Sequence, residues 1–309
     1  MSNRLDDLQT GIDIMSAIID KPINFSITHK KDSSFKDLNN VEIYNIKGVH
    51  PSGNESFQIN KIDPLNFGET IWVIKPEDLS NIGAFFRTGI FSSSRTVAIS
   101  GDSLKSPKYY STIIGASISS LINSDEINDI NNYRFINGDF NESPEIAIVL
   151  DEINDINNYR FINGDPLSGL KVEYSEFLGF YNNSLSVIEE GNNYRMLGWL
   201  PFMYNSIPSF SKTSFSWLLG GAKKVNTNLN GEERAIVVTG EMEKYFPMDI
   251  FPMQLIKACM RGDIEKMESL GIYEVVPEDF GLVDFSCTSK IEAQEIIKNG
   301  IELMLKEVG

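Results

Sequence analysis

The chain has few of the residues that hold metals. Its 309 residues include only two cysteines, Cys259 and Cys287, and two histidines, His29 and His50. A structural zinc site or a four-iron cluster needs about four such ligands close together, whereas these four are scattered along the sequence. The composition therefore favours two buried thiols in a reducing compartment, and we expect neither histidine to be catalytic.

Basic residues are also scarce. Lys and Arg number 27 against 43 Asp and Glu, which gives a formal net charge of −16, and the largest basic clusters are pairs such as Lys30–Lys31. A surface this acidic repels phosphate backbones, so nucleic-acid binding is not expected.

Long apolar runs and nucleotide-binding loops are missing too. The N-terminal segment carries acidic residues where a signal peptide has a basic start. Apolar runs such as Ile146–Leu150 are far shorter than the ~20 residues that span a bilayer. Neither the dinucleotide fingerprint nor the P-loop pattern occurs. If the protein acts at a membrane, other chains must hold it there.

The first part of the chain alternates helices and strands, which is typical of an α/β unit. The patterns predict a helix over 3–20, strands at INFSITHK (23–30) and VEIYNIKG (41–48), a loop at Val49–Ser56, a short buried strand at TIWVIK (70–75), and a helix from Pro76 to the stop at Gly89. The unit opens with a helix and no strand before it, so we expect the piece against which it packs to lie outside this sequence.

A second unit is predicted from residue 95. RTVAISG predicts a strand, KYYSTIIGASISSLI a helix, NNYRFING a strand, DPLSG a turn, and LKVEYSEFLGFYNNSLSVIEEG two further strands. A strand, a helix and a meander of strands over roughly 90 residues are typical of a small β-grasp domain, here 95–192.

The remaining sequence divides into an aromatic connector, which we define as residues 193–240, and a helical part at 241–309. The connector ends in a hairpin-like TNLNGEERAIVVTG, and the helical part contains helices near Pro252–Arg261, Asp263–Leu270 and Lys290–Glu307. Trp199, Phe202 and Trp217 are the connector residues that we select as contacts for a partner chain or a lipid-like quinone. The alternative is a buried strap between domains.

One segment occurs twice. DEINDINNYRFINGD stands at Asp125–Asp139 and again at Asp151–Asp165, 26 residues later. Two copies are too few for a solenoid. Only one strand position lies between the helix before the first copy and the turn after the second, so one copy is surplus. We expect an extra hairpin or loop, or an added edge strand, over about 137–152, with disorder as the alternative.

A loop rich in glycine carries a weak ligand-binding pattern. GVHPSGNES contains Gly53 and Glu55, which could let a backbone approach a ligand and accept a hydrogen bond from it. A tight surface turn with a solvated Glu55 explains the same residues.

From GVHPSGNESFQINKIDPLNFGETIWVIKPEDLSNIGAFFRTG onward, the sequence resembles the A subunit of the sodium-translocating NADH:quinone reductase. SRTVAISG, FLGFYNN, GEERAIVVTGEMEKYFPMDIFP, LGIYEV and EDFGLVDFSCTSKIEAQEII fit that family in order. Two departures stand out: about the first third of the family sequence is absent, and the duplication is not a family feature.

The resemblance implies an α+β fold with four parts. These are a partial Rossmann-like α/β unit (1–94), a β-grasp domain of the soluble-ligand-binding type (95–192), the connector (193–240), and a helical domain resembling a ferredoxin-like tail without its cluster (241–309). In the related tail, C-x-x-C-x-x-C-x-x-x-C-P binds a four-iron cluster. Cys287 aligns with the last cysteine, and the other cysteine positions hold Pro277, Phe280 and Val283, with Thr288 at the proline.

The resemblance implies a peripheral subunit on the cytoplasmic face of a membrane complex that transfers electrons from NADH to ubiquinone and exports Na⁺. We expect no catalytic residue, metal or cofactor in this chain, ubiquinone as a candidate ligand, and NADH and flavins on other subunits. The same comparison places the Gly53–Glu55 loop on a flavin-contacting loop of the relatives, here a relic or a partner contact. The alternatives are a free-standing β-grasp module for a small ligand or sugar, and a degenerate fragment that folds poorly.

Overall fold

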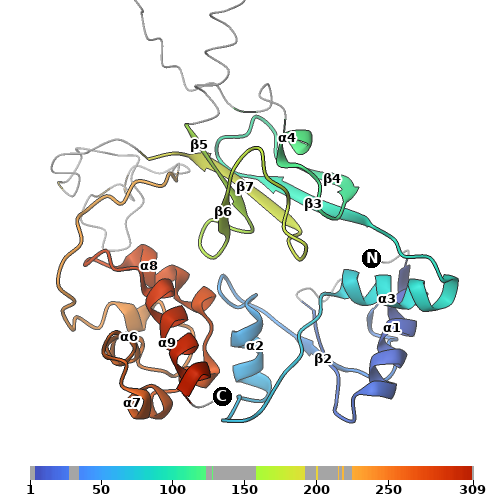
Figure 1. Cartoon of the computed structure of the whole chain (residues 1–309), viewed down its shortest axis with the longest axis horizontal. Helices are drawn as coiled ribbons and strands as arrows, with labels where there is room; N and C mark the ends of the chain where they lie inside the picture. Colours follow the sequence, from blue (N-terminus) through green and yellow to red (C-terminus); the bar gives the residue numbers. More distant parts are fainter. Residues whose placement is uncertain are drawn as a thin grey trace, which may run out of the picture. The chain divides into compact units, whose positions relative to one another are not determined.

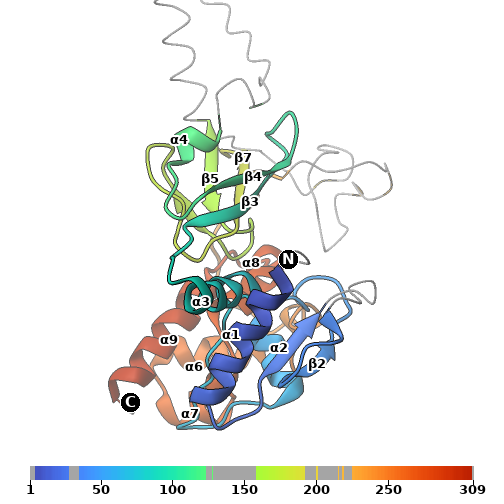
Figure 2. The same ribbon diagram turned by 90° about the vertical axis from the view of Figure 1, so that its right-hand side faces the viewer.

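A computed structural model describes residues 4–27, 35–122, 127, 158–191, 200, 215, 218 and 225–307. The chain divides into two compact units. Unit 1 comprises Met1–Ser93, Met242–Val283 and Ala293–Gly309, and unit 2 comprises Ser94–Glu241 and Asp284–Glu292. Figures 1 and 2 show the elements of both units from two directions.

The front of unit 1 is an α/β layer. Strands β1 (Asn24–Ile27) and β2 (Glu42–Asn45) pair in parallel, and helices α1 (Leu5–Ile18) and α3 (Pro76–Thr88) lie side by side (Figures 1 and 2). The core of this layer consists of Leu8 and Ile12 from one face of α1, Phe25 and Ile27 from alternate positions of β1, and Leu79 from α3. The predicted helix at 3–20 and the predicted strands at 23–30 and 41–48 are therefore confirmed where the structure describes them, as α1, β1 and β2.

Helix α3 begins and ends where its sequence predicts. Pro76 occupies the first turn, where its missing N–H removes no helical hydrogen bond. Gly89 caps the C-terminus with a left-handed φ of 71°, a conformation that glycine adopts without a steric penalty.

The segment TIWVIK is not the buried strand that its composition predicts. Residues 70–75 have no regular structure, and the Trp72 side chain is 83% exposed. Among the described residues no strand pairs with this segment, so its β-branched residues have no sheet against which to pack. Helix α2 (Glu55–Ile62), which the sequence pattern did not reveal, begins inside the predicted loop.

The C-terminal part of unit 1 is helical, as predicted. Helices α6 (Pro252–Arg261), α7 (Ile264–Ser269) and α9 (Ala293–Glu307) match the predicted ones, and the 3₁₀ turns η5 (Met242–Lys244), η6 (Ile272–Glu274) and η7 (Pro277–Phe280) belong to the same part. The short helix α8 (Gly281–Ser286) divides between the two units, since unit 1 includes residues up to Val283 and unit 2 those from Asp284. Buried apolar side chains from these elements include Leu255, Ile256, Met267, Phe280 and Ile297.

Unit 2 contains a mixed five-stranded sheet with the order β4-β3-β7-β5-β6. Its elements are β3 (Ser94–Ser100), β4 (Lys108–Ile113), the short helix α4 (Ile118–Leu121), β5 (Tyr159–Asn163), β6 (Leu170–Val172) and β7 (Ser184–Glu189). β3 and β7 pair in parallel and the other neighbours pair antiparallel. Inward residues of β3, β5 and β7 form the core with α4, including Val97, Ile118, Phe161, Leu185 and Val187.

The helix predicted over KYYSTIIGASISSLI is wrong. Its first half is strand β4, which pairs with β3 from Ser94↔Ile113 to Ile99↔Lys108. Aromatic and β-branched residues favour a strand there, and Gly115, with φ of 73°, ends the extended segment. Only Ile118–Leu121 is helical.

The second copy of the duplicated segment supplies strand β5. Tyr159–Asn163 lies between β7 and β6, and the predicted DPLSG turn closes with a hydrogen bond from the Gly169 N–H to the Asp165 carbonyl (2.9 Å). The extra hairpin or loop predicted over 137–152 lies outside the described residues.

The hairpin predicted at TNLNGEERAIVVTG is not present in the described residues 227–240. Val237 and Val238 are exposed, and the segment is held instead by residue 289. The Arg234 N–H donates to the Ser289 carbonyl (2.9 Å) and the Ser289 hydroxyl donates to the Ala235 carbonyl (3.1 Å). These bonds use backbone groups that a hairpin would pair internally.

Candidate functional site: the anchored ends of the aromatic connector

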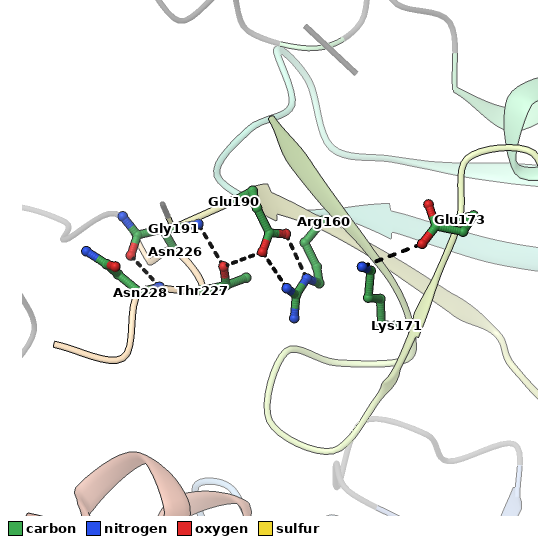
Figure 3. A network of polar contacts seen from close by, with 8 residues as sticks. All are labelled: Arg160, Lys171, Glu173, Glu190, Gly191, Asn226, Thr227 and Asn228. Carbon is green, nitrogen blue, oxygen red and sulfur yellow. Dashed lines mark hydrogen bonds and ion pairs between the residues drawn. The ribbon is translucent and has the colours of Figure 1, made fainter. Parts of the chain in front are cut away.

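The end of strand β7 meets a later stretch of the connector, residues 226–228. The chain leaves the sheet after Glu189 and returns at Asn226, which forms a parallel bridge with Glu189. The Thr227 N–H donates to the Glu189 carbonyl (3.2 Å). Figure 3 shows the bond that the Gly191 N–H donates to the Thr227 hydroxyl (2.7 Å). The end of β7 and residues 226–228 are therefore held together.

An ion pair from the neighbouring strand fixes this junction. Arg160 on β5 donates through Nε to Glu190 Oε2 (2.8 Å) and through Nη2 to Glu190 Oε1, and the Thr227 hydroxyl donates to Glu190 Oε1 (3.0 Å) (Figure 3). The bond from Arg160 is the main reason that the pKa of the Glu190 carboxyl lies below its usual value. A bidentate pair of this kind has a defined geometry and is stronger than a single contact.

Close backbone approach also holds the ends together. A Cβ placed on Gly191 would lie 2.1 Å from the Asn228 backbone nitrogen, so only glycine fits. At a separate point, Asp102 Oδ2 accepts a hydrogen bond from the Val225 N–H (3.0 Å). We call the group Arg160, Glu190, Gly191 and Thr227 the clamp. Its contacts suit it to positioning a segment rather than to chemistry.

The residues that we selected on the connector, Trp199, Phe202 and Trp217, lie outside the described residues. Two of their neighbours are described and expose apolar side chains, Phe215 (37%) and Leu218 (55%). Sequence reasoning missed the clamp because its members are far apart in the chain. The one local signal was the Glu-Glu-Gly sequence at 189–191, where a charged residue and a glycine end a predicted strand.

The Gly53–Glu55 loop packs on the helical part of unit 1. Ser56 donates to Asp279 Oδ1 (2.5 Å), Asn54 Nδ2 donates to the same oxygen (3.3 Å), and Asn60 donates to Glu274 Oε2 (2.6 Å). Gly53 is exposed with open space around it, so packing does not require glycine there. Glu55 is exposed in the first turn of α2, where its charge suits the helix dipole.

Asp279, which the sequence pattern did not single out, is a buried carboxyl at this contact. It is 1% exposed, and burial raises its pKa above the usual value, while hydrogen bonds from Ser56, the Val276 N–H and Asn54 oppose that shift. The folded-state pKa therefore lies above 3.8, the ordinary value. Folding stability falls as the pH rises from 3.8 through the folded-state pKa, because the folded protein binds this proton more tightly than the unfolded chain does.

Replacing Ser56 with alanine should therefore destabilise unit 1 in a pH-dependent way. The loss of the donor leaves a buried carboxylate short of one hydrogen bond, which costs about 1–3 kcal/mol when the group is charged. Urea unfolding should show most of this loss at pH 7.5 and a smaller loss at pH 3, which lies below the raised pKa of Asp279, so that the folded carboxyl is mostly protonated. Ser52→Ala, in the same loop, is the control. An equal loss for Ser56→Ala at both pH values would contradict this role of Asp279.

The positions aligned with cluster cysteines differ in exposure. Phe280 and Val283 are fully buried, Cys287 is 3% exposed, Pro277 is half-buried and Thr288 is exposed. In the part of the chain that the structure describes, no three His, Cys, Asp or Glu side chains come close enough to hold a metal ion. Burial raises the pKa of the Cys259 thiol to about 11, so it is protonated at neutral pH.

The fold and the clamp define a mixed α+β chain, with an α/β unit and a sheet domain in which residues 189–191 and 226–228 are held together. Residues 1–91 match the family model described as "NqrA second alpha/beta domain", and residues 96–140 match "NQRA C-terminal domain", a model of the SLBB type. Among the described residues, no helix has the length and apolarity needed to cross a membrane.

Curated relatives share one name, that of the A subunit of the Na(+)-translocating NADH-quinone reductase. The protein of Neisseria meningitidis serogroup C is 28% identical over 98% of this chain and 62% of its own length. That of Haemophilus influenzae strain PittGG is 30% identical over 97% of this chain and 61% of its own. That of Rhodopirellula baltica is 27% identical over 99% and 62%. The resemblance to this family is thus confirmed by homology along nearly the whole chain. The chain spans about three fifths of the length of these relatives.

Proposed function

We propose that this chain is a peripheral subunit of a membrane complex that transfers electrons from NADH to ubiquinone and exports Na⁺. The observation that carries the proposal is similarity to the A-subunit proteins over 97–98% of the chain. Its partners would be the other subunits, including integral membrane subunits that hold it at the cytoplasmic face. NADH and flavins would be bound by those other subunits.

We assign the four parts of the chain different tasks in this assembly. The partial Rossmann-like unit (1–94) and the helical domain (241–309) would form a scaffold, and the helical domain would be a ferredoxin-like tail without its cluster. Residues 95–192 would be a β-grasp domain of the soluble-ligand-binding type, for which the mixed sheet with a central parallel β3–β7 pair is supporting evidence.

The connector (193–240) would make the contact with membrane subunits or quinone through Trp199, Phe202 and Trp217. Support comes from the clamp, which holds the residue before the aromatic stretch, Gly191, beside Thr227 after it, through the Arg160–Glu190 pair and the Gly191–Thr227 bond. A segment closed at its base loses less conformational entropy when it binds. Aromatic side chains are the residues most enriched where one protein surface meets another.

We further propose that the chain binds no redox cofactor of its own. Pro277, Phe280 and Val283 offer carbon atoms where the related tail offers thiolates, and carbon side chains cannot ligate iron. Burial of Phe280 and Val283 supports a role as core. Gly53 and Glu55 would be a relic of a flavin loop or a partner contact.

Cofactor content tests this part of the proposal. We expect the intact chain, purified without oxygen, to contain less than about 0.1 iron atom and 0.1 flavin per chain, by elemental analysis and absorbance at 450 nm after denaturation, because its cluster positions carry no thiolate partners for Cys287. Cys287→Ser is the matched control and should give the same values. Iron or flavin in one-to-one amount, lost in that variant, would contradict the proposal.

A further inference from the structure

Unit 2 draws on both copies of the duplicated segment. Ile127, the third residue of the first copy, is 5% exposed in the core of the sheet domain and bridges Leu104. Strand β5, Tyr159–Asn163, consists of the ninth to thirteenth residues of the second copy. The described part of the domain therefore contains the early part of one copy and the late part of the other.

The position of β5 between β7 and β6 sets strict requirements. Phe161 is 3% exposed, pairs with Val187 and Val172, and packs its ring against Tyr174 with 5.4 Å between centroids. A charge at this point would be buried without a partner. The first copy meets every requirement, because residues 133–137 are Tyr-Arg-Phe-Ile-Asn, the same five residues as in β5.

Chain length allows either copy to reach the position. With the second copy in place, 37 residues separate the end of α4 from β5 and six separate β5 from β6; with the first copy, the numbers are 11 and 32. Loop-closure entropy depends only on the logarithm of loop length. It therefore favours the second copy by a factor of only about 2.

Local contacts add to that preference. The Asp165 carboxylate accepts hydrogen bonds from the N–H groups of Leu167 (2.8 Å) and Ser168 (3.1 Å) in the tight turn that leads to β6. This turn continues directly from the second copy, whereas Phe140 follows Asp139 in the first. A preference on the order of tenfold for the second copy follows from these few bonds.

We propose that either copy can form the strand between β7 and β6. Residues 133–137 of the first copy would then take the place of Tyr159–Asn163 of the second. The family match at residues 96–140 supports this, because it runs through the whole first copy. The exchange keeps the clamp: Arg134 stands at the place of Arg160 in the repeat and would pair with Glu190. The duplication thus gives the domain a spare central strand.

Buried charges test the exchange in the full chain. In Phe161→Asp the first copy takes the position, so the domain stays folded and its folding equilibrium constant falls by about twentyfold, the product of the two preferences estimated above. Phe135→Asp should change that constant by less than twofold. The double variant has no usable copy, and unit 2 should not fold. Urea unfolding followed by tyrosine and tryptophan fluorescence, with amide exchange of β7 as a local probe, measures each state.

A single-copy chain is the matched control. Deleting residues 140–165 leaves one copy, and Phe135→Asp in that background must abolish folding of the sheet domain. The proposal is overturned if Phe161→Asp unfolds the domain as completely as the double variant does. It is also overturned if the double variant remains as stable as Phe161→Asp alone.

Discussion

Replacing Gly83 with alanine should destabilise unit 1 by roughly 3 kcal/mol or more. A Cβ at this position would lie 1.8 Å from the Asp7 carbonyl oxygen and 2.7 Å from the Gly11 nitrogen, both backbone atoms of α1. Backbone atoms cannot rotate away as a side chain can, so α1 and α3 would have to separate. Urea denaturation of the full chain, monitored by helical circular dichroism, should show an early transition for unit 1.

Gly53→Ala is the control for this experiment. No atom lies within 4 Å of a Cβ placed on Gly53, and its φ is not in the left-handed region, so the change should shift stability by less than about 0.5 kcal/mol. If Gly83→Ala were equally mild, the close packing of α1 on α3 would be wrong.

Replacing Gly191 with alanine should open the base of the connector. The new Cβ would meet the Asn228 nitrogen at 2.1 Å, which is incompatible with the Gly191–Thr227 bond and the return of the chain beside Glu189. Overpacking of this kind costs about 1–3 kcal/mol. Because a loose connector is not preorganised for its partner, we expect about tenfold less of this chain to co-purify with membrane subunits.

Lys171→Ala separates that effect from general damage to the sheet. Lys171 pairs with Glu173 at 3.5 Å in the same region (Figure 3), and both side chains are more than half exposed. Exposed pairs of this kind contribute ~0–1 kcal/mol, so co-purification should be unchanged. Normal assembly of Gly191→Ala would show that the closed base of the connector is dispensable.

The sequence predicted those elements whose signals are local. Helix α1 follows from apolar residues at helical spacing, and α3 from Pro76 and Gly89 at its two ends. Strands β5, β6 and β7 follow from alternating residues between turns. In each case the information lies within about 15 residues, and tertiary contacts agree with it.

The failures occurred where partners distant in sequence decide the structure. The segment at Lys108–Ile113 can read as helix or strand, and only its pairing with β3 settles the question. TIWVIK has strand composition but no strand partner in the described residues, so it stays extended and exposed. The clamp joins residues 160, 190 and 227, a proximity that no spacing rule predicts.

The duplication shows a different limit of sequence reasoning. Identical segments have identical propensities, so local rules cannot choose which copy forms the central strand. The choice depends on the turn that follows Asp165 and on loop lengths, both of which are properties of the folded sheet.

Co-purification tests the central claim most directly. The tagged full chain, expressed with the membrane subunits proposed as its partners and extracted in mild detergent, should purify with them in fixed, near one-to-one amounts. Those amounts should persist through gel filtration, and the isolated chain should remain a cooperatively folded protein. Recovery of the wild-type chain alone, from membranes that contain the intact complex, would contradict its membership of that complex.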